Sequence, residues 1–186
     1  MEKSILISGT GGQGIVAAGE FLSEALFTAG YEVINIRSYG SEARGGSCRS
    51  EVLVSDSEIY DLSLGEVDIL IVLSVPAFRR YQDRAKAGGF VLVDSEVIEK
   101  YDGEIREDIE LVQVRAGEIA LGLGNSIVAN MVLLGALAKR SALIKLDNLK
   151  DAVRTRMRPS MQEINLRALD AGYARVRGAQ TRVEMP

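Results

Sequence analysis

The chain has 186 residues, a formal net charge of −4 and 47% hydrophobic residues, values that predict a single globular domain spanning residues 1–186. The acidic balance and the lack of tryptophan argue against a nucleic-acid-binding protein. There is no histidine and only one cysteine, Cys48. The chain therefore cannot hold an iron–sulfur cluster by itself, and it lacks the ligands of most zinc sites.

The apolar segments are too short for export or for membrane insertion. The N-terminal apolar stretch is only a few residues long, which does not suit a signal peptide. The longest apolar run, residues 127–138, is interrupted by Asn130 and falls short of the ~20 residues that a membrane span needs. The sequence therefore predicts a cytoplasmic protein without membrane contact.

Short apolar strands alternate with helical segments along the chain. A strand at residues 4–8, a helix at 12–29 and a strand at 32–36 predict a βαβ unit. Further strands are expected at residues 48–54, 68–73, 89–94 and 110–114. Further helices are expected at residues 76–87, 116–123, 125–139, 146–157 and 160–177. This alternation predicts an α/β fold of three layers, a doubly wound, mostly parallel sheet with helices on both faces, as in Rossmann-like proteins.

Two polar residues stand out in this pattern. Asn130 lies inside the apolar helix 125–139, so it must find a hydrogen-bond partner, either the backbone of a neighbouring loop or a group of the functional site. Asp94 follows a buried strand. It is expected either to line the crevice at the end of the sheet or to cap the next segment.

A glycine loop separates the first strand from the first helix and fits the pattern G-x-G-x-x-G. Glycines let the backbone turn tightly and approach a phosphate, and the helix offers free N–H groups at its positive end. The predicted cofactor-binding residues here are Gly9, Thr10, Gly11, Gly12, Gln13 and Gly14, of which Thr10 and Gln13 add side-chain hydrogen bonds. A tight turn without a ligand is the alternative.

The end of the second strand bears on which nucleotide is bound. NAD-binding proteins carry Asp or Glu there to hold the ribose diol, whereas this chain has Ile36, Arg37 and Ser38. A guanidinium suits a phosphate. Arg37 therefore favours NADP, or another phosphate-bearing nucleotide such as coenzyme A, over NAD. A solvated charge at the strand end is the alternative interpretation of Arg37.

The segment SYGSEARGGSCRSEV, residues 38–52, combines an aromatic ring and charges with several glycines. The residues predicted to contact a ligand or a partner are Tyr39, Gly40, Glu42, Arg44, Gly45 and Gly46, with Arg49 as a further cation nearby. A structural loop pinned by a Glu42–Arg44 ion pair is the alternative. Together with the glycine loop, this segment is predicted to form one rim at the carboxyl ends of the first two strands.

GTGGQG followed by SYGSEARGGSCRSEV resembles the gamma subunits of 2-oxoacid:ferredoxin oxidoreductases, and most closely the separately encoded gamma subunit of the 2-oxoglutarate enzyme. The similarity continues through VDILIVLS, GGFVLVDSEVI, LGNSIVANMVLLGALA and MQEINLRALDAGYA, and so covers nearly the whole chain. The chain departs from the family at Ser41, where proline is common. Serine makes this turn less rigid without removing a chemical group.

The resemblance implies a complex that converts a 2-oxoacid and coenzyme A to acyl-CoA and CO₂ while it reduces ferredoxin. It implies thiamine diphosphate, Mg²⁺ and iron–sulfur clusters on partner subunits of the alpha, beta and delta types. This chain is expected to support the active site and to bind coenzyme A, without a catalytic residue or a metal ligand of its own. The isolated chain is expected to be inactive, and it can form a homodimer through surface that partners normally cover.

Two other functions stay open at this point. A stand-alone NADP-binding reductase would use Arg37 for the 2′-phosphate and Tyr39 as proton donor, although no suitably placed lysine stands near Tyr39. The corresponding subunit of indolepyruvate:ferredoxin oxidoreductase shares the GGQG loop, but its second motif usually differs from Tyr-Gly-x-Glu-x-Arg-Gly-Gly. In all of these interpretations Cys48 is expected to be structural, because the chain has no histidine to activate it.

Overall fold

The computed structural model describes residues 1–39, 47–60 and 65–176. Its strands form a six-stranded sheet in the order β2-β3-β1-β4-β5-β6. The strands are β1 (Glu2–Thr10), β2 (Glu32–Tyr39), β3 (Ser47–Ser55), β4 (Val67–Val72), β5 (Ala85–Asp94) and β6 (Glu110–Val114). The helices are α1 (Ile15–Thr28), α2 (Val75–Tyr81), α3 (Ser95–Glu99), α4 (Ala116–Gly122), α5 (Ala129–Arg140), α6 (Leu146–Arg156) and α7 (Pro159–Arg175), with 3-10 turns η1 (Gln82–Arg84) and η2 (Ser126–Val128).

One strand of the sheet runs against the others. β3 pairs antiparallel with both β1 and β2, whereas β1, β4, β5 and β6 pair in parallel. The predicted βαβ unit is present, because β1 and β2 run parallel to each other and are joined through α1, but β3 lies between the two strands. Strands that are close in sequence pair readily as antiparallel neighbours, and β3 does so with β2 and then fills the place beside β1. The mostly parallel α/β sheet itself is confirmed.

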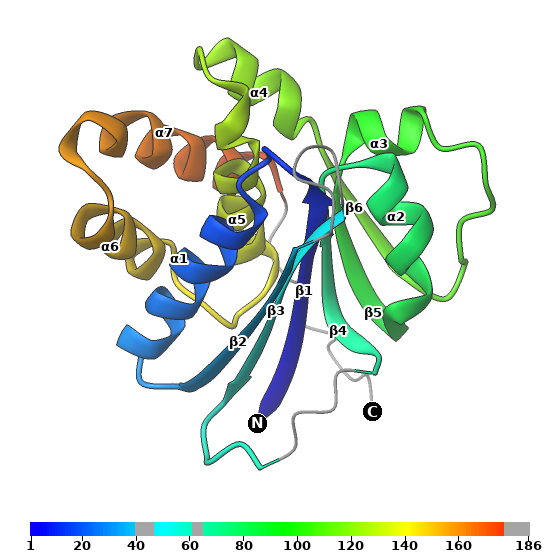
Figure 1. Cartoon of the computed structure of the whole chain (residues 1–186), viewed down its shortest axis with the longest axis horizontal. Coiled ribbons are helices and arrows are strands. Elements are labelled where there is room, and N and C mark those ends of the chain that lie inside the picture. Colours follow the sequence, from blue (N-terminus) through cyan, green and yellow to red (C-terminus); the bar gives the residue numbers. More distant parts are fainter. Residues whose placement is uncertain (40–46, 61–64, 177–186) are drawn as a thin grey trace, which may run out of the picture.

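Helices cover both faces of this sheet but differ in number. Ile5 and Ile7 of β1 belong to a large buried cluster with residues of α1, α5, α6 and α7, whereas Leu6 belongs to a smaller cluster with residues of α2 and α3. This alternation is what a strand buried on both faces requires. Figure 1 shows the corresponding three layers, with α2 and α3 on one side of the sheet and α1, α5, α6 and α7 on the other.

The helix predicted over residues 76–87 is shorter than expected. α2 ends at Tyr81, η1 follows, and β5 begins at Ala85, which pairs with Val67 of β4. Phe78, Tyr81 and Ala85 are all buried. These three residues fall at helical spacing, so the sequence pattern predicts that the helix continues through Ala85, which is in fact the first residue of β5.

α5 is buried along most of its length and crosses α7 in direct backbone contact. All residues from Ala129 to Ala138 are buried, as the apolar sequence predicts, although η2 replaces the first turn of the predicted helix. A methyl group on Gly135 would overlap the carbonyl group of Leu169, and one on Gly172 would overlap that of Val132. This close crossing fixes the position of α5, whose first turn lies beside the glycine loop.

Candidate functional site

The glycine loop joins the end of β1 to the start of α1 at the carboxyl edge of the sheet (Figure 1). Gly12 (φ 97°) and Gly14 (φ 68°) have left-handed backbone conformations, which glycine adopts without steric cost. A Cβ at Gly12 would meet no described heavy atom within 4 Å. Gly14 is the N-cap residue of α1, and no side chain of the described residues caps this end of the helix. The loop is therefore open to solvent at a helix N-terminus, where main-chain N–H groups attract anions.

Gln13 braces this loop from within. Its Oε1 accepts hydrogen bonds from the main-chain N–H of Thr10 (2.8 Å) and from the Thr10 hydroxyl (3.1 Å). Its Nε2 donates to the carbonyl oxygen of Leu73, just after β4 (2.8 Å). Both predicted side-chain ligands are thus engaged within the protein, and their contact with a bound molecule stays a prediction. Main-chain N–H groups are the better candidates for such a contact.

Asn130 reaches the same loop from α5. Its side-chain Nδ2 donates to the carbonyl oxygens of Gln13 (3.2 Å) and Gly14 (3.0 Å). The partner of this buried asparagine is therefore the backbone of a neighbouring loop, one of the two arrangements that the sequence allowed. Because that loop is the predicted ligand loop, Asn130 belongs to the candidate site.

A pocket of about 210 Å³ opens beside Gln13, at the carboxyl ends of β4 and β5. This edge of the sheet contains a topological switch point. The chain continues from β1 to β2 on one side of β1, whereas β4 lies beside β1 on the other side. Ligands of open α/β sheets bind at such a switch point. Ser74, Asp94 and Lys100 contribute polar groups to the lining. Ser74 was not among the residues predicted from the sequence, although a serine two residues before Pro76 signals the cap that it provides to Ala77 at the start of α2.

Asp94 both lines this pocket and caps two helices. One carboxylate oxygen accepts from the main-chain N–H of Glu96 in α3 (3.2 Å), and the other from that of Gly117 in α4 (2.7 Å). Burial raises the pKa of Asp94 despite these two donors, and the nearby carboxylates of Glu96 and Glu99 raise it as well. A single side chain thus ties two helix N-termini to the edge of the crevice.

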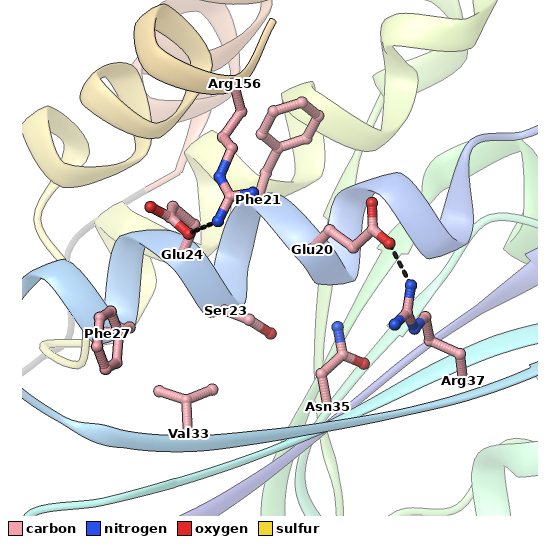
Figure 2. A pocket seen from close by; sticks show the side chains of 9 residues that line it. All are labelled: Glu20, Phe21, Ser23, Glu24, Phe27, Val33, Asn35, Arg37 and Arg156. Atoms are coloured by element: carbon pink, nitrogen blue, oxygen red, sulfur yellow. Dashed lines mark hydrogen bonds and ion pairs between the residues drawn. The ribbon is translucent and has the colours of Figure 1, made fainter.

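Arg37 lies in a different place, a groove of about 520 Å³ between α1 and β2. Figure 2 shows its guanidinium directed at Glu20, with Arg156 paired to Glu24 farther along the groove. The Arg37 and Glu20 side chains are 49% and 53% exposed. An ion pair this exposed contributes little to stability, so Arg37 can exchange Glu20 for a phosphate at small cost. In this structure, however, Arg37 and the glycine loop residue Gln13 line separate pockets.

Much of the second predicted loop lies outside the described residues. The residues concerned are Gly40, Ser41, Glu42, Arg44, Gly45 and Gly46, together with the side chain of Tyr39. The flanking strands are described, and Thr10 pairs with Ser47 while Tyr39 pairs with Cys48. The ends of β1 and β2 therefore lie at the same edge of the sheet, as a common rim requires, but the rim itself stays a prediction.

Arg49 is engaged on the face of the sheet that carries α2. It forms an ion pair with Glu51 (2.8 Å), which also pairs with Arg84 (2.8 Å) and is 3% exposed. Arg49 also donates to the Tyr81 hydroxyl (3.4 Å). Burial raises the pKa of Tyr81, but its hydrogen bonds with Ser47 and Arg49 and the adjacent arginine charges lower it overall. Arg49 is thus part of a charge cluster around the buried carboxylate of Glu51 and not a free cation beside the glycine loop.

Cys48 is buried against the opposite face, near α1. Burial raises the pKa of its thiol, and a hydrogen bond from the main-chain N–H of Val16 offsets only part of this effect. A thiol with a raised pKa is a weak nucleophile at neutral pH, which agrees with the structural role expected of Cys48.

Within residues 1–39, 47–60 and 65–176, no group of three or more His, Cys, Asp or Glu side chains is arranged to hold a metal ion. None of the helices in these ranges has the length and hydrophobicity of a membrane span.

The model of the family "Pyruvate ferredoxin/flavodoxin oxidoreductase" matches residues 4–175. The chain belongs to this family. It is 37% identical over 175 residues to the 2-oxoglutarate synthase subunit KorC of Methanocaldococcus jannaschii, covering 93% of each chain. It is 35% identical over 181 residues to KorC of Methanothermobacter marburgensis, covering 92% of this chain and 95% of that one. The solved gamma subunit of a keto/oxoacid ferredoxin oxidoreductase from Geobacter sulfurreducens is 30% identical with a TM-score of 0.81, covering 94% of this chain and 95% of that chain.

These matches confirm the family resemblance, and other relatives separate the alternatives. The indolepyruvate oxidoreductase subunit IorB of Archaeoglobus fulgidus is less similar, at 27% identity over 190 residues. A 2-oxoglutarate:ferredoxin oxidoreductase from Magnetococcus marinus, solved with 2-oxoglutarate, coenzyme A and succinyl-CoA bound, has a TM-score of 0.82 at 25% identity, over 96% of this chain and 33% of that chain. The family favours an oxidoreductase subunit over a stand-alone NADP-binding reductase, and the identities favour the 2-oxoglutarate branch over the indolepyruvate branch.

Proposed function

We propose that this chain is the gamma subunit of a 2-oxoacid:ferredoxin oxidoreductase that acts on 2-oxoglutarate. The complex converts 2-oxoglutarate, coenzyme A and oxidised ferredoxin to succinyl-CoA, CO₂ and reduced ferredoxin. The similarity to KorC subunits along most of the chain supports this assignment. Within the complex, the chain supports the active site and binds coenzyme A, and it contributes no catalytic residue.

The open glycine loop at the start of α1 is the observation that carries the coenzyme A assignment. Coenzyme A bears a pyrophosphate and a 3′-phosphate, and the first turn of a 14-residue helix presents N–H groups and a positive dipole end to such anions. The space in front of Gly12 is free of described atoms to 4 Å. The related M. marinus enzyme was solved with coenzyme A bound, which supports this choice of ligand.

The remaining cofactors are assigned to partner subunits. Thiamine diphosphate with Mg²⁺ supplies the decarboxylation chemistry when bound, and iron–sulfur clusters carry electrons to ferredoxin. One cysteine and no histidine in this chain support their placement on alpha-, beta- and delta-type subunits. The counterpart of this chain is about a third of the longer M. marinus chain, which supports a need for separate partners here.

Arg37 and the segment from Tyr39 to Gly46 are proposed to face these partners or the ligand. The expected cytoplasmic location and homodimer of the isolated chain stay predictions.

Purification of the tagged chain from its native cell under anaerobic conditions tests the subunit assignment. We expect larger subunits to co-elute, together with the visible absorption of iron–sulfur clusters and with bound thiamine diphosphate. Mass spectrometry identifies the proteins, and reduction of ferredoxin with each 2-oxoacid identifies the substrate. A chain that elutes alone and colourless at its natural abundance would contradict the assignment and would direct the search to NADPH.

A negative charge at the glycine loop is expected to weaken coenzyme A binding. In the assembled enzyme, Gly12→Asp should raise the KM for coenzyme A at least about 10-fold, because like charges placed together at a binding site are strongly unfavourable. Gly12→Asn is the matched control, since both residues tolerate a positive φ and have the same shape. It should change this KM only a few-fold. Steady-state kinetics with coenzyme A varied measures both, and equal effects of the two variants would exclude an anion at this loop.

A further inference from the structure

Asn130 makes an unusual pair of contacts for a buried side chain. It is 4% exposed, and its Nδ2 donates to two consecutive main-chain carbonyls, those of Gln13 at 3.2 Å and Gly14 at 3.0 Å. Both acceptors are carbonyl oxygens, so the nitrogen of the amide must face them. The orientation of the Asn130 side chain is therefore fixed by the backbone of the glycine loop.

These two contacts also set the direction of two N–H groups. The peptide bonds are trans and planar, so each N–H points opposite to the carbonyl of its own peptide group. When Asn130 holds the carbonyl oxygens of Gln13 and Gly14, the N–H groups of Gly14 and Ile15 point away from Asn130. The Gly14 carbonyl is held a second time by the first main-chain hydrogen bond of α1, from Ala18 (2.9 Å).

Position 14 is shaped to admit this amide. A Cβ at Gly14 would overlap Asn130 Nδ2, and the backbone there has φ 68°. A glycine and an asparagine that lie 116 residues apart in sequence thus depend on each other. Any side chain at position 14 would displace the amide that holds the loop.

Packing alone does not account for an asparagine at this position. The Oδ1 atom of Asn130 is buried and has no hydrogen-bond partner among the residues that the structure describes. An unpaired buried acceptor is destabilising, and an apolar residue that fills the same space avoids this penalty. What an apolar residue does not supply is the pair of donors to the loop carbonyls.

We propose that Asn130 is a positioning residue for coenzyme A, which fixes the N–H groups of Gly14 and Ile15 toward the phosphates that the glycine loop receives. The proposal rests on the coenzyme A site proposed above and names a residue that acts on it from behind the loop. Asn130 contacts the carbonyls of the loop backbone, so we expect it to act on the binding of coenzyme A through that backbone. Binding that is equally strong in the ground state and the transition state alters KM more than kcat.

Asn130→Ala in the assembled enzyme tests this role, with Asn165→Ala as the matched control. Asn165 is also 4% exposed, and its Nδ2 also donates to a main-chain carbonyl, that of Met161 in α7 (2.7 Å). We expect Asn130→Ala to raise the KM for coenzyme A on the order of 10-fold, as for loss of oriented charge-assisted hydrogen bonds, with a smaller change in kcat. Asn165→Ala should leave this KM within about 2-fold of the wild-type value.

Amide hydrogen exchange gives a second measurement that does not depend on turnover. Addition of coenzyme A to the wild-type complex should slow exchange in the peptide that spans residues 11–17. The same protection should appear in Asn165→Ala and be reduced in Asn130→Ala. If Asn130→Ala does not assemble, Asn130→Ser retains a donor at this position, and we expect it to give an intermediate KM.

The outcomes separate this proposal from the one on which it rests. If Gly12→Asp raises the KM for coenzyme A but neither variant of Asn130 does, the coenzyme A site stands and the role of Asn130 is wrong. If none of these variants changes the KM, the site and the positioning role both fail. Equal increases for Asn130→Ala and Asn165→Ala would mean a general loss of packing and would also overturn the positioning role.

Discussion

Replacement of Gly172 with alanine is expected to lower the free energy of unfolding by about 3 kcal/mol or more, at or above the upper end of the usual cost of overpacking. The added methyl group would overlap the main-chain carbonyl of Val132 in α5. A flexible side chain can turn away from such an overlap, but a carbonyl in the middle of a buried helix is fixed by its own hydrogen bonds. Because cores are close-packed, the two helices must move apart and lose contact along the crossing.

Gly135→Ala tests the same crossing from the other helix, since its methyl group would overlap the carbonyl of Leu169. Gly122→Ala is the matched control, because Gly122 is also helical but no described atom lies within 4 Å of its added Cβ. This control should change stability by no more than about 1 kcal/mol, and toward greater stability, as alanine favours helix. Urea denaturation followed by circular dichroism measures all three variants. Wild-type stability of Gly172→Ala would mean that the α5 and α7 backbones do not touch.

The sequence predicted the elements better than their arrangement. Apolar runs located every strand of the sheet, because a strand buried on both faces reads as a continuous apolar segment. Nothing in that pattern specifies order, so the insertion of β3 between β1 and β2 was not foreseen. In the same way, Gly135 and Gly172 look like ordinary glycines in a helical segment, and only the crossing of α5 and α7 explains them.

The candidate site was predicted in part, and the part that was missed depends on long-range contacts. The spacing of the glycines located the loop, because the local turn and the helix start determine its chemistry. The sequence required a partner for Asn130 but did not identify it, since the two carbonyls lie 116 and 117 residues away. The second strand was expected to end at Ile36, but β2 continues to Tyr39, so Arg37 lies within the strand. It pairs with Glu20, because the face of the strand on which a side chain lies also decides its partner.

Glu51→Ala is expected to destabilise the protein by about 3 kcal/mol, the lower end of the range for breaking a buried ion pair from one side. Glu51 is 3% exposed and lies between two guanidinium groups, those of Arg49 and Arg84, at 2.8 Å from each. Removal of the carboxylate leaves two positive charges close together without their shared counter-ion. We expect the loss of stability to stay at the lower end of this range, because each arginine keeps another hydrogen bond. Arg49 donates to the Tyr81 hydroxyl, and Arg84 donates to the carbonyl of Gly65.

A surface ion pair provides the control for this change. Glu118 pairs with Arg115, and both side chains are about 70% exposed, so Glu118→Ala should alter stability by no more than about 0.5 kcal/mol. Glu51→Gln should fall between the two, because its amide oxygen still accepts one hydrogen bond while the charge is lost. Thermal and urea unfolding of the three variants measures this order. If Glu51→Ala costs no more than Glu118→Ala, water solvates both arginines once the carboxylate is gone, and the ion pairs of Glu51 do not stabilise the fold.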